Sequence, residues 1–129
     1  MRRTLAMFVL GCALLAGTAV ASGAERIVIS AHDLRKAAID DRNAAEARYL
    51  NKTVRISGIV LSTGISRYMT PNVELSDREG GPVQAICVLP RLDAGKLSDF
   101  KPGQSATMSC RVHALSERAV ILKECTAAE

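Results

Sequence analysis

The sequence contains no tryptophan and only two tyrosines and two phenylalanines among its 129 residues. Its hydrophobic core must therefore be built from aliphatic side chains. Proteins that hold single-stranded nucleic acid on a barrel surface stack the bases on several aromatic side chains. The scarcity of aromatic residues therefore argues against nucleic-acid binding.

Residues that support catalysis or metal binding are also scarce. His32 and His113 are the two histidines, and no phosphate-binding loop, Cys-x-x-Cys, Gly-x-Ser-x-Gly or His-Glu-x-x-His pattern occurs. His113 lies three positions from Cys110 on an expected strand, so the two side chains point to opposite faces and cannot share an ion. His32 falls in an expected first helical turn, where solvent surrounds it. We predict no enzymatic activity, no cofactor and no metal site.

The N-terminus has the three parts of a secretory signal. A positively charged start precedes an apolar run over residues 5–16, and small residues ending at Ala21 follow it. This run is shorter than the stretch of about 20 apolar residues that crosses a membrane. We expect residues 1–21 to be a signal peptide that is cleaved after Ala21, with Ala24 as the second candidate site.

The same segment leaves a second route to the envelope open. Val9-Leu10-Gly11-Cys12 resembles a lipobox, in which Cys12 would carry lipid and become the new N-terminus. The expected location is the periplasm or the exterior, with an outer-membrane lipoprotein as the alternative. Loss of Arg2 and Arg3 with the signal lowers the net charge from +4 to about +2. This small charge gives no electrostatic support to nucleic-acid binding.

Residues 22–50 are predicted to be a lead-in followed by a helical segment. The stretch 26–29 is apolar and extended, and Ser30 followed by Asp33 is typical of a helix start. The pair Asp40-Asp41 indicates a bend between two short helical pieces. We expect this segment to pack on the domain that follows it.

Alternation of apolar and polar residues begins near Lys52 and predicts five strands in the domain 51–129. They are expected over 54–61, around 73–75, and over 82–89, 106–115 and 119–126, with a helix over 92–100. Three strands, a helix and two strands are the order of an OB barrel, in which the helix closes one end. We therefore predict a mainly β, five-stranded OB-fold barrel. An open α+β sheet is the alternative.

Two stretches have an order of residues that is informative as a whole. They are Leu34-x-x-Ala37 with Ala45-x-x-x-Tyr49-x-x-Lys52-x-Val54-x-x-x-Gly58, and Lys101-x-Gly103-Gln104 followed by Cys110 and Cys125. This order resembles the tRNA_anti-like family of small exported OB-fold proteins over about residues 30–126. The chain departs from the family in having Ala38 and Asp41 where Tyr and Asn are frequent. The resemblance implies an exported OB barrel and no particular activity.

Three cysteines, Cys87, Cys110 and Cys125, lie in the expected barrel. In an oxidising compartment, cysteines are expected to pair. If the last hairpin turns between residues 117 and 118, Cys110 faces Cys125, and we predict a disulfide between them. Because the third and fifth strands of an OB barrel are neighbours, a Cys87–Cys125 bridge is the alternative.

The same hairpin register predicts an ion pair, and the predicted disulfide leaves Cys87 unpaired. Arg111 should lie opposite Glu124 as a pair of opposite charges. Cys87 has only aliphatic neighbours on both sides and no basic residue within three positions. We therefore expect it to act as a small buried apolar side chain.

Binding is the function that these residues favour. Arg67 and Tyr68 place a charged and an aromatic side chain together in the expected turn 64–71, and they are the candidate ligand or partner surface. We predict a binding module for an envelope component, which can be a peptide, a glycan or a protein. The alternative is a structural or protein-interaction component of the envelope that takes no small ligand.

Overall fold

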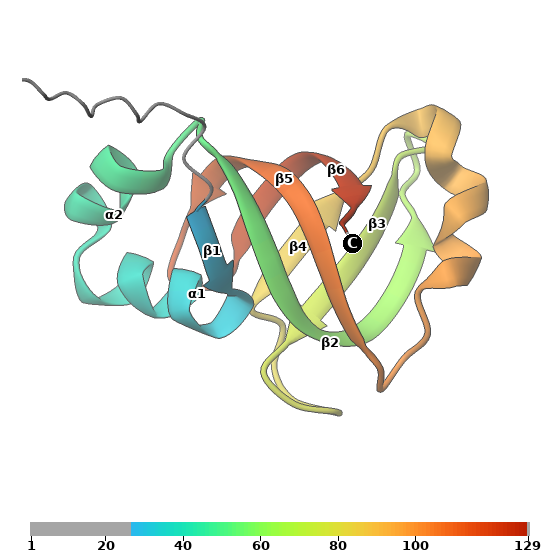
Figure 1. Cartoon of the computed structure of the whole chain (residues 1–129), viewed down its shortest axis with the longest axis horizontal. Coiled ribbons are helices and arrows are strands. Elements are labelled where there is room, and N and C mark those ends of the chain that lie inside the picture. The colour runs from blue at the N-terminus through green and yellow to red at the C-terminus, as the bar shows by residue number, and fades with distance from the viewer. Residues whose placement is uncertain (1–26, 129) are drawn as a thin grey trace, which may run out of the picture.

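The computed structural model of the protein describes residues 27–128 (Figure 1). The expected signal peptide, with Cys12 and both cleavage sites, lies outside this range. The elements are β1 (Ile27–Ser30), α1 (Ala31–Asp40), α2 (Arg42–Tyr49), β2 (Thr53–Ile65), β3 (Pro71–Ser76), β4 (Ala85–Val88), the 3-10 helix η2 (Arg91–Asp99), β5 (Ser105–Leu115) and β6 (Val120–Ala127). None of the helices between residues 27 and 128 has the length and apolar character needed to span a bilayer.

Five of the strands close into a barrel. Neighbouring strands follow the order β2-β3-β4-β6-β5, and β5 pairs back with β2. The long strand β2 makes this closure, because residues 53–59 pair with β5 and residues 59–65 pair with β3. Closure removes the exposed edges that an open five-stranded sheet would have. The predicted mainly β, five-stranded barrel is confirmed.

The extended lead-in is a sixth strand. β1 pairs in parallel with the first half of β2, from Ile27 opposite Val54 to Ser30 opposite Ser57. Ile27 and Ile29 pack against the core, whereas Val28 is 68% exposed. Four residues are too few to show an alternating pattern. The sequence therefore predicted that this segment is extended, but it did not predict that the segment pairs with β2.

Polar side chains cap both N-terminal helices. The hydroxyl of Ser30 accepts a hydrogen bond from Asp33 N at 3.0 Å and so caps α1. Asp41 is extended, with φ −160°, and its carboxylate caps α2 by accepting from Ala44 N at 3.1 Å. The break between the helices therefore lies at Asp41, where the sequence predicted a bend.

Helix α1 covers one end of the barrel (Figure 1). Its inner face consists of Ala31, Leu34 and Ala38, which are all buried. Arg35 donates from Nε and Nη2 to the carbonyl of Glu117 at 3.1 and 2.9 Å, which ties the helix to the turn between β5 and β6. Two alanines on the inner face allow the helix to lie close to the strands.

Two elements differ from their predicted form. β4 is shorter than the predicted strand 82–89, because regular pairing with β3 covers only residues 85–88. Pro82 has no N–H to donate to a strand partner, and it lies in the irregular segment before β4. The predicted helix over 92–100 is a 3-10 helix that starts directly after Pro90.

The last hairpin has the predicted register at its turn and at its far end, but not in its middle. Leu115 lies opposite Val120 as predicted, whereas Arg111 lies opposite Lys123 and not opposite Glu124. The register shifts by one between Ala114 and Val112, and a second shift between Arg111 and Ser109 restores it. Glu124, beside the second shift, has a left-handed backbone with φ 55°. Such bulges increase the local twist that a closed barrel needs. The predicted backbone pairing of Arg111 is wrong, yet its Nη2 still reaches Glu124 Oε2 at 2.9 Å, and this hydrogen bond lowers the pKa of the Glu124 carboxyl.

Candidate functional site

The turn between β2 and β3 carries both predicted surface residues, Arg67 and Tyr68. Its backbone is held by two hydrogen bonds, from Ser66 N to Thr70 O and from Met69 N to Ser66 O, each 2.9 Å long. The Ser66 hydroxyl also accepts from Tyr68 N at 3.2 Å and from Thr70 N at 3.3 Å. One serine therefore organises the turn and fixes the backbone that presents Arg67 and Tyr68.

Met69 has an unusual conformation for its residue type. Its φ is 63°, in the left-handed region that non-glycine residues rarely occupy. Its side chain is also 66% exposed, so burial does not offset the cost of this backbone. Strained backbone in an exposed loop is a feature that clusters at binding sites.

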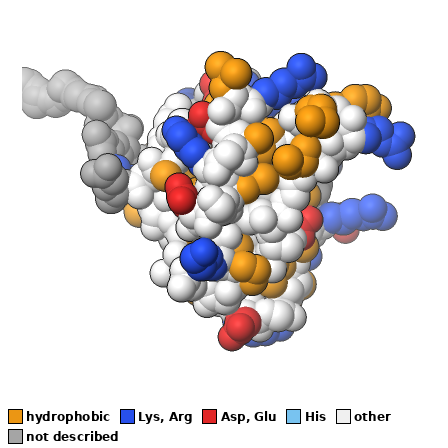
Figure 2. Space-filling view, turned by 90° about the vertical axis from the view of Figure 1, so that its right-hand side faces the viewer, with side chains coloured by type: hydrophobic (Ala, Val, Ile, Leu, Met, Phe, Trp, Pro, Cys, Tyr) orange, Lys and Arg blue, Asp and Glu red, His pale blue; other side chains and the backbone are white. Residues whose placement is uncertain are grey.

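Apolar side chains gather around this turn. Ile65, Tyr68 and Met69 are 51%, 69% and 66% exposed, and they are half of the six strongly exposed large hydrophobic residues in the described chain. Leu92, at 97% exposed, is the second residue of η2, which packs beside β2 and β3 at the same end of the barrel. Figure 2 faces this end and shows hydrophobic side chains gathered over its upper part. We name Ile65, Tyr68, Met69 and Leu92 the apolar tip.

Positive charge borders the apolar tip. Arg67 lies within the turn, and Arg91 precedes Leu92 on η2, both with exposed side chains. On the same helix Lys96 pairs with Asp93, with 3.5 Å between Nζ and Oδ1. Figure 2 shows lysine and arginine side chains beside the hydrophobic ones. The end of the barrel therefore combines an apolar centre with a basic border.

Only part of this surface followed from the sequence. Arg67 and Tyr68 were identified because they share a turn, but Ile65, Met69 and Leu92 were not. The available signal was the position of Met69 inside a polar turn, where an apolar side chain has no core to join. Leu92 gave no such signal, since its place at the start of a helix fits a buried role equally well.

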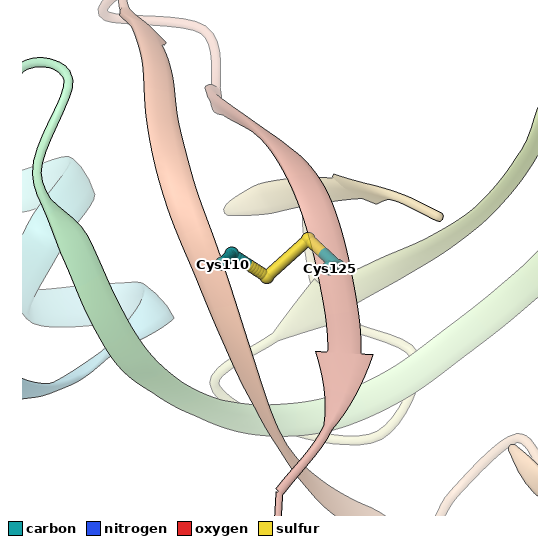
Figure 3. Close-up of a disulfide and its surroundings, with 2 residues drawn as sticks. All are labelled: Cys110 and Cys125. Atoms are coloured by element: carbon teal, nitrogen blue, oxygen red, sulfur yellow. A yellow bond between two sulfur atoms is a disulfide. The ribbon is translucent and has the colours of Figure 1, made fainter. Parts of the chain in front are cut away.

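A disulfide joins Cys110 on β5 to Cys125 on β6 (Figure 3). The two Cα atoms are 4.2 Å apart, and both residues are buried. This is the pair that the hairpin predicted, and the alternative Cys87–Cys125 bridge is not present. The bridge lies beside the bulge at Glu124, where the strands change register.

Cys87 is a free thiol next to this bridge. It is fully buried on β4, and the sulfur atoms of Cys87, Cys110 and Cys125 all lie within 4.8 Å of one another. Burial raises the pKa of Cys87 to about 12, so the thiol keeps its proton and is a weak nucleophile and metal ligand. Two of the three sulfurs are already bonded to each other, which leaves the cluster without a ligand set.

Cys87 is expected to resist thiol reagents while the protein is folded. Ellman's reagent at pH 8 should label no barrel thiol in the native protein, because Cys87 has no solvent contact in the fold. In guanidinium, the reagent should label Cys87, which is one thiol within residues 27–128. Cys87→Ala is the control and should show no barrel thiol under either condition. Rapid labelling of the native protein would contradict the buried position.

The same burial predicts a pH effect on stability. The folded pKa of about 12 lies above the ordinary value of 9.0, so the unfolded chain loses this proton first as pH rises. The stability contributed by the protonated thiol is complete below pH 9 and falls by about 1 kcal/mol per pH unit towards pH 12. Urea titrations of the wild type and Cys87→Ala measure this effect, because the decrease in stability between pH 9 and 12 that is due to Cys87 should be absent from the variant. Around pH 7 the difference in stability between the two proteins should not depend on pH.

The two histidines lie apart from the cysteines. His113 is exposed on β5, while Cys110 is buried, as expected from their spacing on one strand. His32 is less simply placed than predicted. Its imidazole is 49% exposed, but Nδ1 lies 3.6 Å from Oδ2 of Asp77, a residue that the sequence indicated only as part of a polar loop.

Comparison with known proteins places this fold. A search of curated proteins finds no significant match. The structure is similar to a Klebsiella pneumoniae protein named "putative nucleic acid-binding lipoprotein", with a TM-score of 0.66 and 14% identity over 79% of this chain and 91% of that one. The OBody AM3L09, solved with hen egg-white lysozyme, has a TM-score of 0.46 and 16% identity over 64% and 86% of the two chains. The likeness to the Klebsiella protein shows a shared fold.

The sequence itself gives the family. The sequence model named tRNA_anti-like matches residues 7–126, which include both N-terminal helices and the strands of the barrel except for the last residue of β6. The match extends over the two stretches whose residue order resembled this family. The chain therefore belongs to the tRNA_anti-like family.

Proposed function

We propose that the protein is an exported binding module that holds a component of the cell envelope at the apolar tip. The observation that carries this proposal is an organised turn that presents Tyr68, Met69 and Arg67 to solvent. Tyrosine, methionine and arginine are enriched where proteins meet partners. A protein or peptide partner fits this composition best. A glycan that stacks on Tyr68 is the alternative, and a purely structural contact in the envelope is a third possibility.

Three observations support export. The N-terminal residues have the pattern of a secretory signal. The Cys110–Cys125 disulfide belongs to the kind of bond that persists outside the cytoplasm. The similar Klebsiella protein is named a lipoprotein. We place the protein in the periplasm or outside the cell, with a lipid anchor at Cys12 as the alternative.

Nucleic-acid binding is the competing function, because the name of the Klebsiella protein includes the words "nucleic acid-binding". In the described part of this chain, Tyr68 is the one strongly exposed aromatic side chain. Between the buried residues of β3 lie Asn72 and Glu74, and β4 adds Ile86 and Val88. These side chains offer no stacking platform, and Glu74 repels phosphate. Binding of an envelope component is therefore the function that we favour, and we propose no catalysis.

Replacement of the tip residues tests this proposal. Arg67→Ala/Tyr68→Ala should reduce crosslinking to the partner in detergent-solubilised envelope by roughly tenfold or more, because interface aromatics and arginines carry much of the binding energy. Both side chains are exposed, so the free energy of unfolding should change by less than about 0.5 kcal/mol. The measurement is mass spectrometry of the material crosslinked to each variant.

Arg118→Ala is the matched control for this experiment. Arg118 is an exposed arginine in the turn between β5 and β6, beside α1 at the other end of the barrel. Its replacement should leave the crosslinked partner unchanged. Equal crosslinking by wild type, Arg67→Ala/Tyr68→Ala and Arg118→Ala would exclude the apolar tip as the binding surface. The chemical class of the crosslinked partner distinguishes a protein from a glycan.

A further inference from the structure

Strand β2 changes its neighbour at Gly58, and a crevice opens there. β1 pairs up to Ser57 through its last residue, Ser30, while β3 pairs from Ile59 through its last residue, Ser76. The carboxyl ends of β1 and β3 therefore meet head to head along the same edge of β2. From this point the chain leaves β1 into α1 and leaves β3 into the loop before β4. The two connections therefore diverge from one point on the surface of β2.

Gly58 permits this meeting of elements. A Cβ atom built at Gly58 would lie 3.0 Å from both Leu75 Cβ and Ser76 O, and 3.4 Å from Ala31 Cβ. Because glycine has no Cβ, the end of β3 and the start of α1 can both approach β2 at this residue. The crevice that remains between them has a volume of about 370 Å³, which lies within the range of small-molecule sites.

One wall of the crevice carries a histidine and a carboxylate from different elements. His32 comes from α1 and Asp77 from the end of β3, with 3.6 Å between Nδ1 and Oδ2. The Asp77 carboxylate also accepts from Arg78 Nη1 at 3.1 and 3.2 Å and from the Ser76 hydroxyl at 3.2 Å. Its charge is therefore already balanced by arginine, which makes the crevice a poor site for a cation. A carboxylate on the wall also disfavours an anion.

The floor supplies free hydroxyl groups and an apolar surface. Ser57 on β2 and Ser105 at the start of β5 line the crevice, together with Ile59, which pairs with Ser105. The hydroxyls of Ser30 and Ser76 are already hydrogen bonded to Asp33 N and Asp77. Within residues 27–128, those of Ser57 and Ser105 have no side-chain hydrogen bond and are available to a ligand. A serine hydroxyl can both donate and accept, as a sugar hydroxyl can.

We propose that this crevice binds one residue of a neutral sugar. The sugar hydroxyls pair with Ser57, Ser105 and the remaining lone pairs of Asp77, and the apolar face of its ring lies on Ile59. His32, on the wall beside Asp77, offers one further polar contact. The site is separate from the apolar tip, which lies at the far end of β2, so it does not depend on the function proposed above. The sugar can be a free monosaccharide or one unit of an envelope glycan, since both present the same ring.

Chemical-shift titration tests the site with defined probes. We would titrate the ¹⁵N-labelled protein with glucose, galactose, N-acetylglucosamine and a soluble chito-oligosaccharide at millimolar concentrations. The expected result is saturable shifts of the amides of Ser57, Gly58, Ile59, Asp77 and Ser105 with at least one probe. Tighter binding of the oligosaccharide than of the monosaccharides identifies a glycan as the source, and equal binding identifies a free sugar.

Two variants make this test specific. Ser57→Leu fills the crevice and removes a hydroxyl, and it should weaken binding by roughly tenfold or more. Ser62→Leu makes the same substitution at an exposed position of β2 outside the crevice, and it should bind as the wild type does. Arg67→Ala/Tyr68→Ala should also bind normally, which separates this site from the apolar tip. Absence of saturable shifts with every probe, or equal binding by Ser57→Leu and wild type, would overturn the proposal.

Discussion

Replacing Cys110 and Cys125 together with alanine is expected to lower the free energy of unfolding by about 3 kcal/mol. The bridge joins residues 15 apart in sequence, and a loop of this length restricts the unfolded chain by about that amount. A small domain has a total stability of roughly 5–15 kcal/mol, so this loss is a large share of it. Urea titration followed by circular dichroism measures the change.

The double replacement is needed because a single one leaves a second route to a bridge. Cys125 lies within 4.8 Å of Cys87 as well as of Cys110, so Cys110→Ala alone can form a Cys87–Cys125 disulfide. Wild-type protein that has been reduced and kept reduced is the control, because it loses the bridge without losing any side-chain atom. It should be destabilised to a similar extent, and the double variant should not respond to reductant. A change below about 1 kcal/mol in both samples would contradict the role of the bridge.

The sequence allowed the barrel and its disulfide to be predicted from alternation and from the length of the last hairpin. That hairpin also shows where such reasoning ends. Arg111 was placed opposite Glu124 by counting back from the turn, but a bulge between Val112 and Ala114 shifts its partner to Lys123. A bulge depends on the curvature of the whole barrel, and no local residue pattern determines it. The bulges do not separate Cys110 from Cys125, since both side chains remain on the core side of the strands.

The candidate surfaces were predicted less completely, for a related reason. Arg67 and Tyr68 are neighbours in sequence, so their shared turn was visible. His32 and Asp77 are brought together only because β1 and β3 end on either side of Gly58 on β2. That arrangement required β1 to be recognised as a strand of the sheet. A site formed by segments that are distant in sequence depends on the strand topology, and the sequence did not reveal the pairing of β1 with β2.

Leu34→Ala should destabilise the protein about as much as loss of the disulfide does. Leu34 is fully buried between α1 and the barrel, and truncation of a buried leucine costs about 2–5 kcal/mol, depending on how far the site can collapse. Ala31 and Ala38 flank it on the inner face and are too small to fill the space that it leaves. We expect a loss near the middle of that range, measured by urea titration.

Ile39→Ala is the matched control, because Ile39 lies on the same helix and is 52% exposed. Its replacement should cost less than about 1 kcal/mol, since little of its surface leaves water on folding. The slope of the titration carries separate information, because it scales with the surface exposed on unfolding. An unchanged slope in Leu34→Ala means that α1 still unfolds together with the barrel, held at its other contact by Arg35 on the Glu117 carbonyl. Equal losses in Leu34→Ala and Ile39→Ala would show that α1 adds nothing to the core, and the barrel would then have to be stable without it.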